Sequence, residues 1–245
     1  MTEQLPDDLA ALVIAADAAA SRLAGVRLVV LVAAAPDPAA TAPAAPSPLA
    51  AAGEPQAGVH QAARASLAGL GRPDLATDLP VPAATAGAIA AATGLPRRRG
   101  PLPVDLAVLA LRLDPPRPVV PVAVDANTDG AALVALGQRI AEALADYDTP
   151  AALVAAGEGS AALSERAPRH HVDGADAWQE QYVAAWQDGD AQAIAALGPG
   201  EAARVHARGW APATVTAAAA VGAGLEPSLC HHAAPRGVGY VVAAG

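Results

Sequence analysis

The 245-residue chain contains no phenylalanine, and tryptophan and tyrosine occur only three times each. Aliphatic side chains, mainly alanine with leucine, valine and isoleucine, must therefore fill the core. Where alanine meets alanine, the backbones of neighbouring elements can pack closely. A chain of this length can bury a substantial core, and we expect a single α/β domain spanning residues 1–245.

Cysteine occurs once, as Cys230, which excludes an intrachain disulfide and a cysteine-rich zinc site. We expect Cys230 to be a buried structural residue in a reducing compartment. No apolar run reaches the roughly 20 residues of a membrane span, and the N-terminal residues are acidic where a signal peptide would be basic. These features predict a cytoplasmic protein that has no membrane partner.

Positive charge is scarce as well, because 15 Lys plus Arg face 24 Asp plus Glu, for a formal net charge of −9. Such a chain lacks the broad basic field that attracts a phosphate backbone, so nucleic acid is not an expected partner. The one cationic run, Arg97-Arg98-Arg99, is too short to form a basic patch. We expect it to be a solvated loop.

Hydrophobic periodicity predicts strands and helices that alternate along most of the chain. The expected strands are residues 26–34, 104–113, 119–124, 151–156, 228–233 and 238–243. The expected helices are residues 6–24, 60–70, 82–93, 131–147, 176–197 with a break near Gly189, 200–208 and 212–220. Between them, the Pro/Ala-rich stretch 35–57 indicates a long surface loop, and 71–82 indicates a connection. This order favours a three-layer α/β/α fold around a mostly parallel mixed sheet, with an antiparallel pair at the C-terminal end.

The best candidate site is the loop of residues 157–171, which follows the apolar strand 151–156. Ligands of open α/β sheets bind just beyond the carboxyl ends of strands. The loop offers Glu158, Ser160 and Glu165 as pocket residues, and the adjacent His170 and His171 as candidate catalytic residues. Ser160 has two interpretations, a nucleophile on a turn or a serine that caps one. We prefer the second, because the glycines of a Gly-x-Ser-x-Gly elbow are absent.

Histidine also raises the question of a metal site. A transition metal needs three or four converging ligands, and two histidines with one carboxylate form such a set. The candidates are His60, Glu158, His170 and His171. Because no spacing fixes their convergence, the alternative of metal-free surface or loop histidines stays open. Dinucleotide and P-loop motifs are absent, which removes the best sequence support for those functions.

Five segments in the second half of the chain carry a resemblance to a known family. They are Gly157-Glu158-Gly159-Ser160, Ser164-Glu165-Arg166-Ala167-Pro168, the helix from Trp178 to Trp186, Gly209-Trp210-Ala211-Pro212, and Ala234-Pro235-Arg236-Gly237-Val238-Gly239-Tyr240. Over about residues 100–245, the chain resembles the divergent actinobacterial branch of the class III extradiol ring-cleavage dioxygenases, in the superfamily of their catalytic subunits, which also contains Memo-like proteins. The resemblance implies one α/β domain with non-haem Fe(II) on two histidines and a carboxylate. It also implies a further histidine that moves protons while oxygen enters a catechol-type ring.

Several residues that the resemblance requires are missing from this chain. The family's first metal histidine lies in a His-Pro-Pro turn after an N-terminal strand, whereas this chain begins with a helix. The second follows the next strand, where this chain has Ala35-Pro36-Asp37-Pro38 and no histidine before His60. Ala161 stands where the proton-transferring histidine would follow Gly159-Ser160. Glu226 is the nearest acidic residue to the expected carboxylate ligand.

The resemblance and these departures lead to three hypotheses. The first is a divergent dioxygenase-like protein that has lost Fe(II)-dependent ring cleavage, has no cofactor, and keeps a small-molecule or partner-binding pocket on loop 157–171. The second is an active metal-dependent dioxygenase or other oxidoreductase that uses Fe(II) in a rebuilt site of His60, Glu158, His170 and His171. The third is a non-catalytic subunit packed against an active partner chain. A homo-oligomer is compatible with all three.

Overall fold

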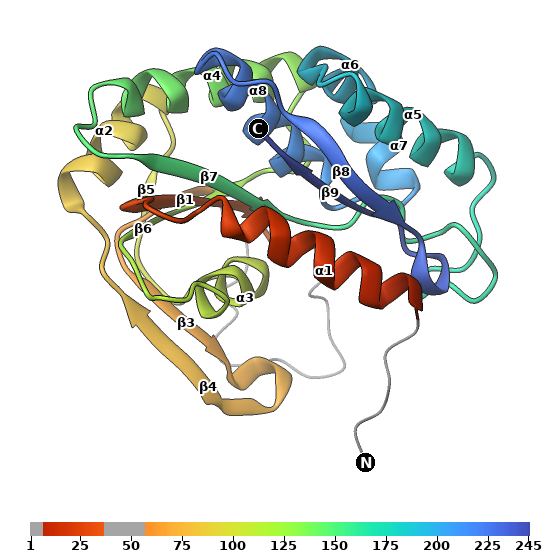
Figure 1. Ribbon diagram of the computed structural model, residues 1–245, viewed down its shortest axis with the longest axis horizontal. Coiled ribbons are helices and arrows are strands. Elements are labelled where there is room, and N and C mark those ends of the chain that lie inside the picture. Colours follow the sequence, from red (N-terminus) through yellow and green to blue (C-terminus); the bar gives the residue numbers. More distant parts are fainter. Residues whose placement is uncertain (1–6, 37–56) are drawn as a thin grey trace.

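A five-stranded sheet forms the centre of the computed structural model, which describes residues 7–36 and 57–245 (Figure 1). The strand order is β5-β2-β6-β1-β7, and three of the four strand pairs are parallel, with β2 and β6 antiparallel. The strands are β1 (Leu28–Ala34), β2 (Gly58–His60), β5 (Arg97–Arg98), β6 (Val119–Val124) and β7 (Ala151–Ala156). The predicted α/β fold with a mostly parallel mixed sheet is confirmed.

Strand β1 lies between two layers, as its uninterrupted apolar run predicts. Val30 and Val32 face one hydrophobic cluster, and Val29 and Leu31 face the other, because successive side chains of a strand point to opposite faces. The first cluster is built from the helices α2 (Ala83–Thr93), α4 (Gly130–Ala145) and α8 (Trp210–Gly222). The second is built from the helix α3 (Val104–Leu111) and the hairpin of β3 (Ala63–Leu67) and β4 (Arg72–Leu79). Helices therefore cover both faces of the sheet.

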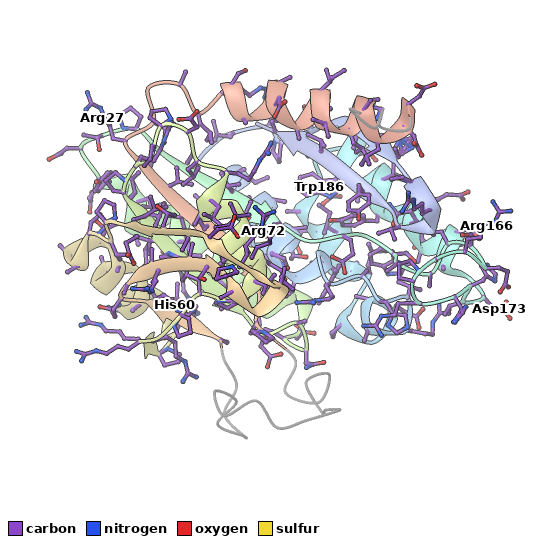
Figure 2. The ribbon with its side chains drawn as sticks, turned by 90° about the horizontal axis from the view of Figure 1, so that it is seen from below. Arg27, His60, Arg72, Arg166, Asp173 and Trp186 are labelled. Atoms are coloured by element: carbon purple, nitrogen blue, oxygen red, sulfur yellow. The ribbon has the colours of Figure 1, made fainter. Side chains whose placement is uncertain are left out.

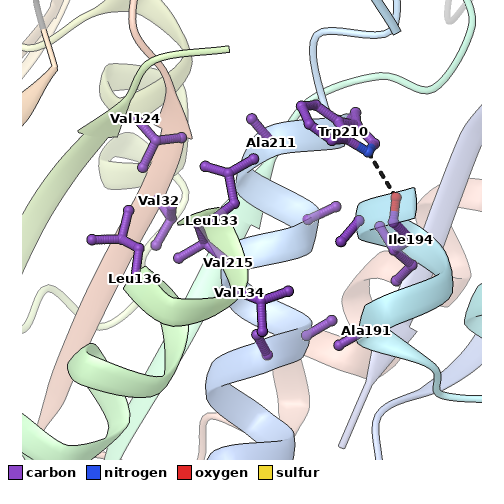
Figure 3. Close-up of a cluster of buried hydrophobic side chains, with 14 of the residues drawn as sticks. Val32, Val124, Leu133, Val134, Leu136, Ala191, Ile194, Trp210, Ala211 and Val215 are labelled. Atoms are coloured by element: carbon purple, nitrogen blue, oxygen red, sulfur yellow. Dashed lines mark hydrogen bonds between the residues drawn. The ribbon is translucent and has the colours of Figure 1, made fainter. Parts of the chain in front are cut away.

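Helices α4 and α8 pack closely because small residues line their contact. A Cβ atom on Gly137 of α4 would lie 2.3 Å from the carbonyl oxygen of Val215 on α8, so the two backbones nearly touch. Larger side chains of the same helices fill the space around this contact (Figure 3). Trp210 begins α8 and donates from Nε1 to the carbonyl of Ile194 at 2.7 Å. A chain poor in aromatic residues thus gains its core density from backbone proximity.

The C-terminal part of the chain adds a further layer beside the sheet. It contains α5 (Ala175–Gln187), α6 (Ala191–Ala196), α7 (Pro199–Arg204), β8 (Ser228–Ala233), the short 3-10 turn η2 (Pro235–Gly237) and β9 (Tyr240–Ala244). Strands β8 and β9 are antiparallel, as predicted, but they form a separate two-stranded sheet. The first helix, α1 (Asp7–Ser21), lies alongside this hairpin (Figure 1).

Three predictions of secondary structure are wrong around the β3–β4 hairpin and α3. The helix predicted over 60–70 is replaced by the end of β2, by β3 and by the 3-10 turn η1 (Ala68–Leu70), and the connection predicted over 71–82 contains β4. The strand predicted over 104–113 is helix α3. Alanine suits both periodicities, so tertiary pairing decides such segments.

Two side-chain predictions also need correction. Arg97 and Arg98 do not lie in a solvated loop, because they pair with Val59 and His60 as the edge strand β5. Cys230 is exposed and not buried, since β8 turns alternate residues toward solvent. The predicted loop 35–57 lies mostly outside the described residues, which omit 37–56. Among the helices of the described ranges, none combines the length and apolarity of a membrane span.

The α4–α8 contact yields a prediction about two helical glycines. Gly137→Ala should lower the free energy of unfolding by about 1–3 kcal/mol, because its new Cβ atom collides with the backbone of α8. Gly200→Ala in α7 is the matched control, since a Cβ atom there meets nothing within 4 Å. It should raise stability by about 0.5–1 kcal/mol. Urea denaturation measures both, and equal effects would contradict the close packing of α4 and α8.

Candidate functional site

Loop 157–171 leaves the carboxyl end of β7, as predicted, and its inner half (residues 157–163) is bound to the start of β9. Gly159 N donates to Gly239 O at 2.8 Å, and Gly239 N donates to Ser160 O at 2.7 Å. Leu163 N donates to Gly237 O at 3.0 Å. Residues far apart in the sequence therefore pair like neighbouring strands. This pairing satisfies the N–H groups of Gly159 and Leu163 and the carbonyl group of Ser160.

Glycine makes a second close approach possible, between this loop and the start of α8. A Cβ atom on Gly157 would lie 2.3 Å from the Cα atom of Gly209, and Gly157 has a φ of +157°. Gly209 N donates to the carbonyl of Glu158 at 2.7 Å. Any side chain at either glycine would separate the two segments.

Gln179 of α5 completes the inner half, although the sequence did not predict its role. Its Oε1 atom accepts a hydrogen bond from Ser160 N at 2.8 Å. Cβ atoms built on Gly159 or Gly239 would each lie 2.4 Å from its side-chain amide, so these glycines make room for it. The only sequence signal is a polar residue directly after Trp178, on a helix whose inward face is aromatic.

Ser160 is completely buried, and both hydrogen-bonding functions of its hydroxyl group are used. Oγ donates to Val205 O at 3.1 Å and accepts from Ala162 N at 3.2 Å. This geometry is that of a serine capping a turn, the interpretation preferred from the sequence. Ala161 beside it is 7% exposed, and its N–H group donates to Val205 O at 3.2 Å.

The outer half of the loop (residues 164–171) is largely exposed and carries the predicted histidines. His170 is exposed and has a φ of 57°. His171 Nε2 lies 3.5 Å from Asp176 Oδ2, and its Nδ1 lies 3.9 Å from Asp173 Oδ1. Glu165 is exposed. The two histidines are thus on the surface, with His171 held near the first turn of α5.

Glu158 lies apart from these histidines, next to the hairpin. Its side chain is half-buried, and burial together with the Glu158 carboxylate raises the pKa of Tyr240. Tyr240 is the first residue of β9. The acidic pocket candidate thus faces a phenol and not a histidine.

His60 lies in β2 and is 6% exposed, with neither imidazole nitrogen hydrogen-bonded. Burial, followed by the Arg98 guanidinium, lowers the pKa of His60 to about 4. Its neighbour Gln61 also has a buried Nε2 atom without a partner. His60 is therefore a neutral residue of the sheet at physiological pH.

The candidate metal ligands do not converge. Figure 2 shows His60 at the far side of the molecule from Arg166 and Asp173, which flank the two histidines in the chain. Across residues 7–36 and 57–245, no group of three or more His, Cys, Asp or Glu side chains could hold a metal ion. The residues present therefore do not fit the Fe(II) that the resemblance implies.

Two shallow cavities lie away from the loop. One, of about 390 Å³, is lined by α4, α8 and the turn between α5 and α6, with Gln138 and Asp190 at its wall. The other, of about 400 Å³, lies between Arg27 and the Pro115–Pro118 turn. Neither is lined by Glu158, Ser160 or Glu165, so the predicted pocket residues do not meet around either cavity.

Ser160→Ala tests the structural role of this serine. The substitution removes the hydrogen bonds to Val205 O and Ala162 N in a buried site. We expect the free energy of unfolding to fall by about 1–3 kcal/mol. Ser21→Ala, which removes an exposed hydroxyl at the end of α1, should change it by less than about 0.5 kcal/mol. A Ser160→Ala protein as stable as wild type would refute the turn-capping role.

His60 predicts a pH dependence of stability. Because its pKa falls from 6.5 to about 4 on folding, the unfolded chain binds more protons between these values. The free energy of unfolding is therefore unaffected by the titration of His60 above pH 6.5. It falls by about 3 kcal/mol in total as the pH falls toward 4. The His60→Leu protein should lack this loss, while His232→Leu, at an exposed site, should keep it. A constant stability difference between wild type and His60→Leu over this window would contradict the burial of a neutral imidazole.

Comparison of the chain with models of known protein families gave no match, and comparison with curated proteins gave none.

Proposed function

We propose that this chain is a divergent, non-catalytic relative of the class III extradiol dioxygenases that acts by binding a small molecule or a partner protein through loop 157–171. The observation that carries the proposal is the closed inner half of the loop. Ser160 and Ala161 are buried there, and the backbone around them is hydrogen-bonded to the β8–β9 hairpin and to Val205. General acid or base catalysis requires a titratable side chain that reaches the substrate. The one titratable side chain of the inner half is Glu158, which lies beside the Tyr240 phenol and has no histidine of the inner half with it.

The same closure gives the outer half a fixed support. Residues 157–163 are held by α5, by the α7–α8 junction and by the hairpin, all of which belong to the main body. The exposed residues that follow are therefore presented from a rigid base. Binding loops on rigid scaffolds keep their affinity because less conformational entropy is lost on association.

The composition of the chain supports a reducing compartment for this role. Cys230 is the single cysteine of the sequence, and it is exposed on β8 with no disulfide. An exposed free thiol is compatible with the cytoplasm, where thiols are kept reduced.

Metal analysis and oxygen uptake test the proposal. Protein purified without a polyhistidine tag is incubated anaerobically with Fe(II), desalted, and assayed by elemental analysis and by oxygen consumption with a panel of catechols. We expect substoichiometric iron and no oxygen uptake above buffer, because the candidate ligands lie far apart. An active extradiol dioxygenase under the same conditions is the positive control.

The opposite result identifies a rebuilt metal site. Stoichiometric iron that is lost in His60→Ala or in the His170→Ala/His171→Ala protein, together with catechol-dependent oxygen uptake, would overturn the non-catalytic proposal. It would favour the active dioxygenase with a rearranged site.

A further inference from the structure

Three arginines and two histidines lie on segments that meet at the outer half of loop 157–171, and we call this group the cationic tip. Arg166, Arg169 and His170 belong to the loop, His206 follows α7, and Arg236 lies in η2. Three contacts place these segments together. Leu163 N donates to Gly237 O, and a Cβ atom on Gly237 would touch Ser164 and Ala167. Arg169 is close enough to His206 for its charge to affect the pKa of that imidazole. Burial, followed by the charge of Arg169, lowers the pKa of His206.

Within the described ranges, the arginines of the cationic tip have no acidic partner. The ion pairs there involve other arginines and His171, and none includes Arg166, Arg169 or Arg236. Among the nearby carboxylates, Glu201 is bound by Arg204, and Asp176 and Asp173 lie 3.5 and 3.9 Å from the imidazole nitrogens of His171. The loop itself carries Glu158, beside Tyr240, and the exposed Glu165. Three arginines without an ion pair in adjoining segments are unexpected in a chain with a formal charge of −9.

The backbone of the cationic tip is unusual in the same places. Among residues 7–36 and 57–245, the non-glycine residues with a positive φ are His170 at 57°, His206 at 56° and Arg236 at 55°. All three belong to the cationic tip. A left-handed backbone costs free energy for residues with a Cβ atom and persists where the surroundings impose it, often at binding sites. The left-handed backbone positions therefore fall in the segments that form the cationic tip.

We propose that the cationic tip docks an acidic segment of a partner protein, an inference that rests on the binding function proposed above. Guanidinium groups bind carboxylates through paired, charge-assisted hydrogen bonds. Figure 2 shows Arg166 at the periphery of the molecule, pointing away from it. Small molecules prefer concave sites, and neither cavity described above is lined by a residue of the cationic tip. A protruding, charged surface fits a macromolecule.

The negative charge of the rest of the chain favours an acidic protein segment over other polyanions as the partner. Nucleic acids and anionic membranes present dense, extended negative charge, which a body with a formal charge of −9 repels. A short acidic segment of a protein contacts the cationic tip while keeping the remainder of its charge away. Exposed arginine pairs of this kind mainly set association rate and specificity.

A fluorescein-labelled oligoglutamate peptide is the probe for this test. Fluorescence anisotropy measures its binding to the wild-type chain and to the tip variant Arg166→Glu/Arg169→Glu/Arg236→Glu. The matched control is Arg22→Glu/Arg27→Glu/Arg139→Glu, which changes the net charge equally at exposed positions outside the cationic tip. We expect the tip variant to bind at least about tenfold more weakly than wild type and the control to stay within about twofold at physiological ionic strength.

Folding and alternative ligands are measured in the same experiment. Circular dichroism and urea denaturation establish that each variant is folded, and Arg166→Gln/Arg169→Gln replaces the tip variant if it is not. Equal weakening by tip and control variants, or no binding by wild type, would overturn the inference. Tighter binding of single-stranded DNA or phosphatidylserine vesicles than of the peptide would also overturn it. If the protein holds no iron, takes up no oxygen and binds the peptide equally with and without the tip arginines, this inference alone is refuted. Iron-dependent oxygen uptake would instead refute the proposed function.

Discussion

The backbone of Gly157 and Glu158 approaches the backbone of Gly209 at a distance that excludes a side chain, and Gly159 and Gly239 leave room only for the side chain of Gln179. A Cβ atom on Gly209 would lie 2.6 Å from the carbonyl oxygen of Glu158, and one on Gly239 would lie within 2.4 Å of the Gln179 amide. These contacts bring the end of β7, the start of α8 and the start of β9 to one point. Because the exposed loop residues follow directly after this point, its geometry helps to determine where they lie.

This constraint separates the two halves of the loop in function. The inner half uses its polar groups internally, with Ser160 bound to Val205 and to its own turn. A buried hydroxyl whose donor and acceptor functions are both satisfied stabilises the fold and is not available to a ligand. The outer half makes fewer backbone contacts with the body, and its charged side chains face solvent. Support and recognition thus occupy adjacent parts of one loop.

The sequence predicts the elements whose pattern has a single physical meaning. Valine-rich apolar runs identify β1 and β6, and the helical spacing of Leu133, Leu136 and Ile140 identifies α4. The predictions for segments 60–70 and 104–113 are wrong, since short runs rich in alanine and leucine satisfy both periodicities. The position of the site loop was predictable from strand β7. Its contacts with Gln179 and Gly239 were not, because they join residues far apart in the sequence.

The distribution of charge gives the acidic body a role in recognition. A partner with an acidic segment is repelled by a surface that carries most of the 24 Asp and Glu residues, and it is attracted at the cationic tip. Specificity is the difference in binding free energy between correct and incorrect contacts. Repulsion of the acidic segment by the rest of the surface therefore adds to the specificity that the three arginines give. The left-handed backbone at His170, His206 and Arg236 fixes the directions in which these side chains leave the body. A rigid cationic surface on an acidic chain thus limits both the place and the orientation of docking.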